Sequence, residues 1–160
     1  MLDNITVSYS SIKQYNLYIV YYICGLFNDN YFDWVKHQLS VIINQINDKN
    51  IIQLNKSIIY IIVTIQITKQ NEFIDKLYKF FPKQIFIVEF FTKNEYEYQG
   101  INKVWELGQK HHKKNDIILY YHSKGISNYK NYNDVDVQVG RWNMSSVITD
   151  LKKPFQIFDE

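Results

Sequence analysis

The stretch Asp116–Tyr129, D-I-I-L-Y-Y-H-S-K-G-I-S-N-Y, places an unbroken apolar run directly before a polar turn. Its residues Ile117–Tyr121 show no polar alternation, which is typical of a strand covered on both faces in a parallel sheet. We therefore expect this strand to lie centrally. Because open parallel sheets bind ligands beyond the carboxyl ends of their strands, the residues after the run are candidate ligand-binding residues: His122, Ser123, Lys124 and Gly125.

Three earlier stretches are also rich in β-branched and aromatic residues, and we predict them as strands: Leu17–Cys24, Ser57–Ile67 and Ile85–Phe91. Between the strands, apolar residues recur at three- and four-residue steps, which predicts amphipathic helices. Their stripes are Phe32, Val35, Leu39, Ile42, Ile43 and Ile46 in the first helix, Phe73, Leu77 and Phe80 in the second, and Ile101, Val104, Trp105 and Gly108 in the third.

The third helix carries two further signals. Asn94-x-x-Glu97 has the form of a capping box at its start, and Gly108 would let the helix approach the sheet closely. We expect its apolar stripe, including Trp105, to face the core, as we expect of Trp34 in the first helix.

The predicted order β-α-β-α-β-α-β favours a parallel sheet with right-handed crossovers, and hence a single Rossmann-like α/β domain. We expect residues 1–16 to be a loosely attached lead-in, residues 17–151 to form the Rossmann-like unit and residues 152–160 to be a tail. A last helical stripe within the unit comprises Met144, Val147, Ile148 and Leu151.

Composition narrows the function classes. The chain has 160 residues and is 46% hydrophobic, which is enough for a single hydrophobic core. Its formal charge of +2 is too small to indicate binding to the phosphate backbone of nucleic acids. The apolar run Leu17–Phe27 is about half the ~20 residues that cross a bilayer, so we expect no membrane span. The single Cys24 suits a reducing compartment, so we expect a cytoplasmic protein with a buried thiol.

Glycine placement disfavours two nucleotide-binding classes. The loop after the first strand lacks G-x-G-x-x-G, and G-x-x-x-x-G-K-[ST] occurs nowhere in the chain. Dinucleotide oxidoreductases and phosphate-loop NTPases are therefore disfavoured.

The H-S-K-G turn supplies an imidazole, a hydroxyl, a lysine and a glycine that lets backbone approach a ligand, a set that suits a diphosphate. The alternative is that His122 caps the sheet edge while Lys124 is solvated. Arg141, the single arginine, could bind phosphate or carboxylate through two nitrogens, or form an ion pair at a helix end.

Two other clusters are weaker candidates for metal sites. Asp134-Val135-Asp136 has the D-x-D form that can hold Mg²⁺ or Mn²⁺, but acids before a predicted helix also suit the helix dipole. His111 and His112 are followed by two lysines that would repel a cation, so we interpret them as a solvated helix end. A divalent metal is not favoured, and we predict no cofactor.

Four motifs in order, Y-I-V-Y-Y-I-C-G-L-F-N, Y-E-Y-Q-G-I at Tyr96–Ile101, I-L-Y-Y-H-S-K-G and R-W-N-M, resemble a glycosyltransferase-like family of large DNA viruses and bacteria. The family pattern includes E-Y-P-G-I, H-[ST]-K-G and a W-R-x-x-M helix. The resemblance covers about Leu17–Leu151; Gln99 replaces the proline of the family, and the family's later strands are not found in this sequence.

The resemblance implies a GT-A-like fold that binds a nucleotide-diphosphate sugar. It places His122 and Lys124 where many such enzymes hold an acidic metal motif, and it places Tyr96, Glu97 and Gly100 near the nucleotide. The general base would come from a second half that we expect to be missing, so no catalytic residue is assigned and activity as an enzyme stays open. We expect a truncated transferase that self-associates or binds a partner protein; the alternative is a non-catalytic nucleotide- or protein-binding module, and a methyltransferase is a third interpretation.

Overall fold

The fold is a four-stranded parallel sheet with helices on both faces, a Rossmann-like α/β arrangement as predicted. The computed structural model describes residues 14–26, 31–48 and 54–123. Along the chain the elements are β1 (Tyr15–Cys24), α1 (Tyr31–Asn47), β2 (Leu54–Thr64), the 3-10 turn η1 (Ile67–Lys69), α2 (Gln70–Phe80), β3 (Phe86–Phe91), α3 (Tyr98–Lys110) and β4 (Asp116–His122).

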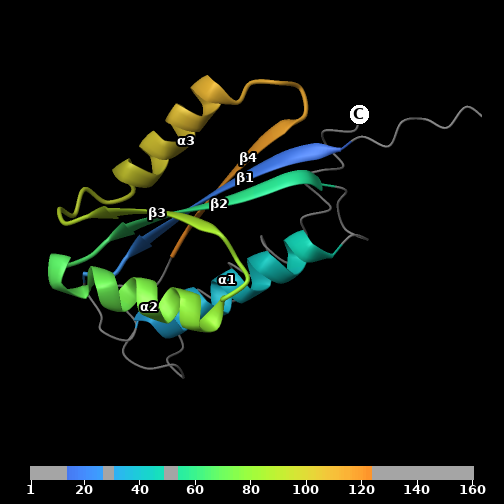
Figure 1. Ribbon diagram of the computed structural model, residues 1–160. Coiled ribbons are helices and arrows are strands. Elements are labelled where there is room, and N and C mark those ends of the chain that lie inside the picture. The colour runs from blue at the N-terminus through green and yellow to red at the C-terminus, as the bar shows by residue number, and fades with distance from the viewer. Residues whose placement is uncertain (1–13, 27–30, 49–53, 124–160) are drawn as a thin grey trace, which may run out of the picture.

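The strand order is β3-β2-β1-β4, and every neighbouring pair is parallel. Figure 1 shows α1 and α2 on one side of the sheet and α3 alone on the other. This division follows from right-handed crossovers, because the chain moves in one direction from β1 to β3 and in the opposite direction from β3 to β4.

The most deeply buried strand is β1, where Leu17–Ile23 expose at most 3% of each residue. Its odd-numbered side chains, such as Leu17 and Tyr21, join the core beneath α1 and α2, whereas Tyr18, Val20 and Tyr22 join a smaller core beneath α3. The alternation of side chains across a strand assigns each residue to one of the two cores.

The expectation that strand four lies centrally is wrong for the part of the sheet that the structure describes, where β4 pairs with β1 alone and forms an edge. Its apolar run is nevertheless half-covered on both faces, because Ile117 and Tyr121 lie in one core while Ile118 and Tyr120 contact the other. An apolar run reports coverage of faces and carries no information about the number of neighbouring strands.

The third predicted helix exists, but the side that faces the sheet differs from the predicted one. Val104 of the predicted stripe lies against the sheet together with Gly100 and Leu107, whereas Ile101 and Trp105 are 55% and 65% exposed. A methyl group added at Gly108 would meet no atom within 4 Å, so this glycine has no role in the approach to the sheet. The approach is made at Gly100 instead.

The start of the third helix and several strand boundaries also differ from the prediction. Asn94 and Glu97 form no capping box, since α3 begins at Tyr98 and the Asn94 side chain instead accepts a hydrogen bond from the backbone of Tyr96. β1 begins at Tyr15, and β2 ends at Thr64, before the exposed Ile67. Trp34 is buried as predicted, whereas Cys24 is partly exposed.

Candidate functional site

The strand order reverses between β1 and β4, and their carboxyl ends lie side by side. Tyr22 of β1 stands in register with His122 of β4. In open α/β sheets such a reversal leaves a crevice between the diverging loops, and ligands bind there. His122 lies at the carboxyl end of its strand, as predicted.

Ser123 ties the two strand ends together. Its backbone N–H donates to the carbonyl oxygen of Tyr22 at 2.9 Å, and its hydroxyl oxygen accepts from the Cys24 N–H at 3.4 Å. The residue is buried. Ser123 was predicted to bind a ligand, but its observed contacts are structural. They hold the ends of β1 and β4 at a fixed spacing.

Glu97 joins the two motifs that the sequence singled out. One of its carboxylate oxygens lies 3.2 Å from Nδ1 of His122, and the other accepts a hydrogen bond of 3.2 Å from the hydroxyl of Tyr120. The Tyr120 and His122 rings are parallel, with centroids 6.1 Å apart. We call Glu97, Tyr120 and His122 the acid–imidazole cluster.

The cluster fixes the histidine ring. A carboxylate on Nδ1 holds the proton on that nitrogen and orients the imidazole, which leaves Nε2 to serve a ligand. Within the described ranges Nε2 of His122 has no hydrogen-bond partner. Burial and the neighbouring Glu97 carboxylate raise the pKa of Tyr120, so its hydroxyl stays protonated and donates to Glu97.

Gly100 allows α3 to bring Glu97 to this position. A Cβ at residue 100 would lie 2.8 Å from Cβ of Tyr22 and 2.9 Å from the ring of Tyr120. Such distances are impossible without movement of the helix or the strands. The glycine therefore acts on the site through the backbone, by setting the height of α3 above β1 and β4.

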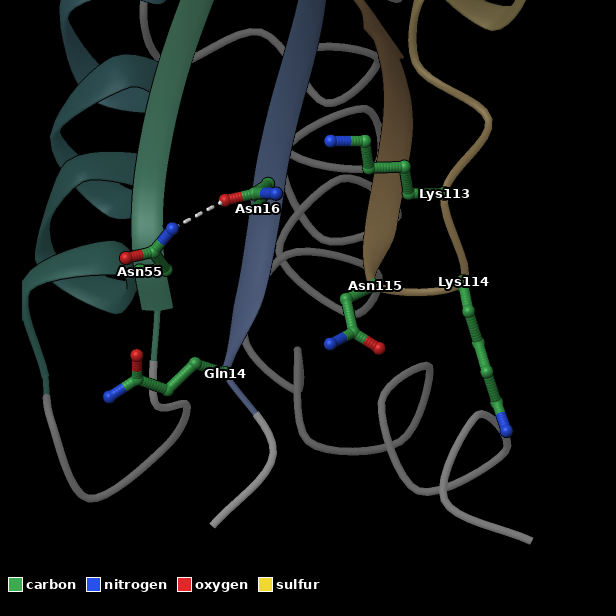
Figure 2. A pocket seen from close by; sticks show the side chains of 6 residues that line it. All are labelled: Gln14, Asn16, Asn55, Lys113, Lys114 and Asn115. Carbon is green, nitrogen blue, oxygen red and sulfur yellow. Dashed lines mark hydrogen bonds between the residues drawn. The ribbon is translucent and has the colours of Figure 1, made fainter. Parts of the chain in front are cut away.

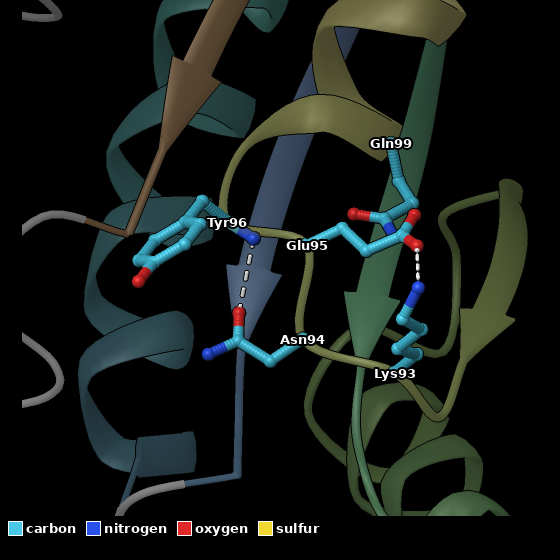
Figure 3. Close-up of polar contacts among 5 residues, drawn as sticks. All are labelled: Lys93, Asn94, Glu95, Tyr96 and Gln99. Atoms are coloured by element: carbon cyan, nitrogen blue, oxygen red, sulfur yellow. Dashed lines mark hydrogen bonds and ion pairs between the residues drawn. The ribbon is translucent and has the colours of Figure 1, made fainter.

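The loop before α3 presents Tyr96 to solvent in an unusual backbone conformation. Tyr96 has φ 55°, in the left-handed region that non-glycine residues seldom occupy, and it is 82% exposed. The side chain of Asn94 holds the turn through the Tyr96 N–H at 3.0 Å, and Lys93 pairs with Glu95 at 2.6 Å. Figure 3 shows the Tyr96 ring pointing away from Glu95 and Gln99.

This arrangement is able to bind anions and transfer protons. An imidazole with one nitrogen held by a carboxylate can donate from Nε2 to a phosphate oxygen when protonated, or accept a proton when neutral. Among the described residues, no three His, Cys, Asp or Glu side chains gather as metal ligands.

The structure brings together His122, Glu97 and Gly100 from the predicted set, with Tyr96 next to them in the chain. Lys124, Gly125, Arg141 and the D-x-D pair Asp134 and Asp136 lie outside the described residues. Sequence reasoning missed Tyr120. A signal for it existed, because residues two apart in a strand share a face, so Tyr120 had to lie beside His122.

A hollow lies at the opposite end of the sheet from His122. It measures about 500 Å³ and is lined by Gln14, Asn16, Asn55, Lys113, Lys114 and Asn115. In Figure 2 these polar side chains surround the starts of β1, β2 and β4. Asn16 is already bonded to Asp116 at 2.8 Å and to Asn55 at 3.0 Å, so part of the lining is engaged in joining strands.

Helix length bears on the membrane question. In the described part of the chain, none of the helices has the length and apolar character needed to cross a bilayer.

Comparisons of the chain with protein-family models, with curated proteins and with solved structures find no match.

Proposed function

We propose that the crevice between β1 and β4 binds the diphosphate of a nucleotide-diphosphate sugar and that the protein is glycosyltransferase-like. The observation that carries the proposal is the contact between Glu97 and Nδ1 of His122 at the carboxyl end of β4. It fixes the orientation of a histidine at the position where parallel sheets bind ligands, so that Nε2 can donate to a phosphate oxygen when the ring is protonated. The resemblance of the Y-E-Y-Q-G-I and H-S-K-G motifs to a transferase family supports the same ligand class.

His122 and Lys124 would share the phosphate oxygens. His122 would donate from Nε2 when its ring is protonated, and the carboxylate of Glu97 would hold the ring in place through Nδ1. Lys124, two residues further along the chain, would supply a second positive charge. Such a pair can neutralise a diphosphate without a divalent metal, which agrees with the scarcity of acidic residues in the H-S-K-G turn.

Tyr96 would contact the nucleoside. Strained backbone conformations concentrate at functional sites, and an exposed aromatic ring gives a base a surface on which to stack. The left-handed backbone of Tyr96, one residue before Glu97, is the second observation in favour of a nucleotide ligand.

Calorimetric titration with a panel of UDP- and GDP-sugars tests the proposal. We expect one donor class to bind, and we expect His122→Ala and Lys124→Ala each to weaken binding about tenfold or more, since a charge-assisted hydrogen bond contributes about 1.5–3 kcal/mol. Glu97→Gln should weaken binding in the same direction. Glu106→Gln is the matched control, because Glu106 lies on the same helix but pairs with Lys103 away from the crevice.

Two results would contradict the proposal. The first is the absence of binding by any nucleotide-diphosphate sugar. The second is loss of binding in Asp136→Asn and with EDTA while Lys124→Ala binds normally, because that outcome assigns the ligand to a metal at the D-x-D pair. A parallel assay for release of the nucleotide diphosphate distinguishes a transferase from a binding module.

A further inference from the structure

The outer side of α3 carries an apolar stripe of Tyr98, Ile101 and Trp105, which we call the α3 outer stripe. These residues are 62%, 55% and 65% exposed, and their three- and four-residue steps align them along one side of the helix. Figure 1 shows that α3 is the only described helix on its side of the sheet, so no neighbouring described helix covers the stripe.

The stripe matches itself when the helix is reversed. Tyr98 and Trp105 lie at its two ends with Ile101 between them, so an antiparallel second copy places Tyr98 near Trp105 and, within one residue of the same register, Ile101 near Ile101. A two-fold dimer needs this property, because one patch must serve as both surfaces. Tyr and Trp are also the residues that most often carry the energy of protein interfaces.

The charges at the two ends of α3 also favour an antiparallel pair of helices. The amino end carries Glu95 and Glu97 with one lysine, whereas residues 110–114 hold three lysines and no acid. In an antiparallel pair, the acidic end of each helix lies beside the basic end of the other, and the helix dipoles are also opposed. A parallel arrangement would bring like charges together at both ends.

Space beside the stripe allows close approach. Gly108 lies one turn beyond Trp105, and the absence of any atom within 4 Å of an added Cβ shows that its outer side is open. A second helix can therefore approach the backbone there.

We propose that two copies of this chain form a two-fold dimer through antiparallel contact of their α3 outer stripes. The dimer joins the chains on the side of the sheet opposite α1 and α2. The amino end of α3, with Glu95 next to it in the chain, then lies near the lysine-rich segment 110–114 of the partner.

Sedimentation velocity over a range of protein concentrations tests the dimer. We expect the wild-type chain to dimerise, and we expect Ile101→Glu or Trp105→Glu to raise the dimer Kd by about 30-fold or more, because each substitution occurs on both sides of the interface. Ile85→Glu is the matched control: Ile85 is 86% exposed and lies outside α3, so its substitution should leave the Kd unchanged.

Charge reversal tests the antiparallel orientation. Glu95→Lys or Lys110→Glu alone should weaken the dimer, and the double variant should recover most of the lost affinity. A wild-type chain that stays monomeric at 100 µM, a concentration of the order at which weak dimers form, overturns the proposal and assigns the stripe to another occupant. A dimer that survives Ile101→Glu, or one in which the double charge reversal brings no recovery, also overturns it.

Discussion

Gly100 is the residue whose size decides how closely α3 lies over β1 and β4. A methyl group at this position would meet Tyr22 and Tyr120 at 2.8 and 2.9 Å, and both contacts lie on strands that cannot give way independently. We expect Gly100→Ala to destabilise the fold by about 1–3 kcal/mol, the usual cost of overpacking a core. Urea unfolding of dilute, monomeric protein measures this change.

Gly108→Ala provides the comparison on the same helix. No atom lies within 4 Å of the added carbon, so the substitution should stabilise the fold by about 0.5–1 kcal/mol through helix propensity alone. If both variants unfold at the same urea concentration, α3 does not pack closely on the sheet at Gly100.

Part of the site could be predicted from the sequence, residue by residue. His122 was placed correctly at a strand end, because the apolar run before it and the polar turn after it mark that end. Its contact with Glu97 could not be predicted, because the two residues lie 25 positions apart and meet only through the height of α3. The position of Tyr120 could have been predicted, because residues two apart in a strand lie on the same face and Tyr120 precedes His122 by two.

At the scale of elements, α3 has two apolar sides, and this explains the error in its predicted orientation. Periodicity predicted one stripe of Ile101, Val104, Trp105 and Gly108, but Val104 packs toward the sheet with Gly100 and Leu107, whereas Ile101 and Trp105 are exposed. A pattern of spacing reports that residues share a side. It does not report which of two apolar sides meets the core.

Leu107 and Trp105 therefore give a direct test of the orientation of α3. We expect Leu107→Ala to cost about 2–5 kcal/mol, because the side chain is buried beneath the helix. Trp105→Ala should change the stability of the monomer by no more than about 0.5 kcal/mol, as is usual for exposed positions. The opposite ranking in thermal and urea unfolding would show that the predicted stripe faces the sheet after all.

The strands were predicted more closely than the helix faces. All four exist and run parallel, since β-branched and aromatic runs of this length have few alternatives. The edge position of β4 in the described part of the sheet could not be read from its sequence, because both an edge strand and a central strand are apolar when helices cover both faces.

At the scale of the whole molecule, buried tyrosines couple stability to alkaline pH. Burial raises the pKa of Tyr121 from its ordinary value of 10.0 to about 12, and burial also raises the pKa of Tyr21 and Tyr22. The folded protein thus keeps protons that the unfolded chain releases above pH 10. The stability that these tyrosines contribute is therefore fully present below pH 10 and is lost as the pH rises through about 12.

Tyr121→Phe should lessen this loss. The variant removes one titrating group, so its free energy of unfolding should decline less steeply than that of the wild type above pH 10, in urea titrations read by circular dichroism. Tyr78→Phe makes the same chemical change at a partly exposed position and serves as the control. Equal slopes for Tyr121→Phe and wild type would show that Tyr121 ionises without unfolding.

The pairing of β1 with β4 has a consequence for how the chain acquires its fold during synthesis. Asn16 and Asp116 are hydrogen-bonded although 100 positions separate them in the chain. Translation delivers β1, β2 and β3 to the ribosome exit before β4, so a three-stranded intermediate with one uncovered face can form first. The carboxyl ends of β1 and β4 come together only when the last strand pairs, so the proposed binding site is assembled only after His122 has left the ribosome.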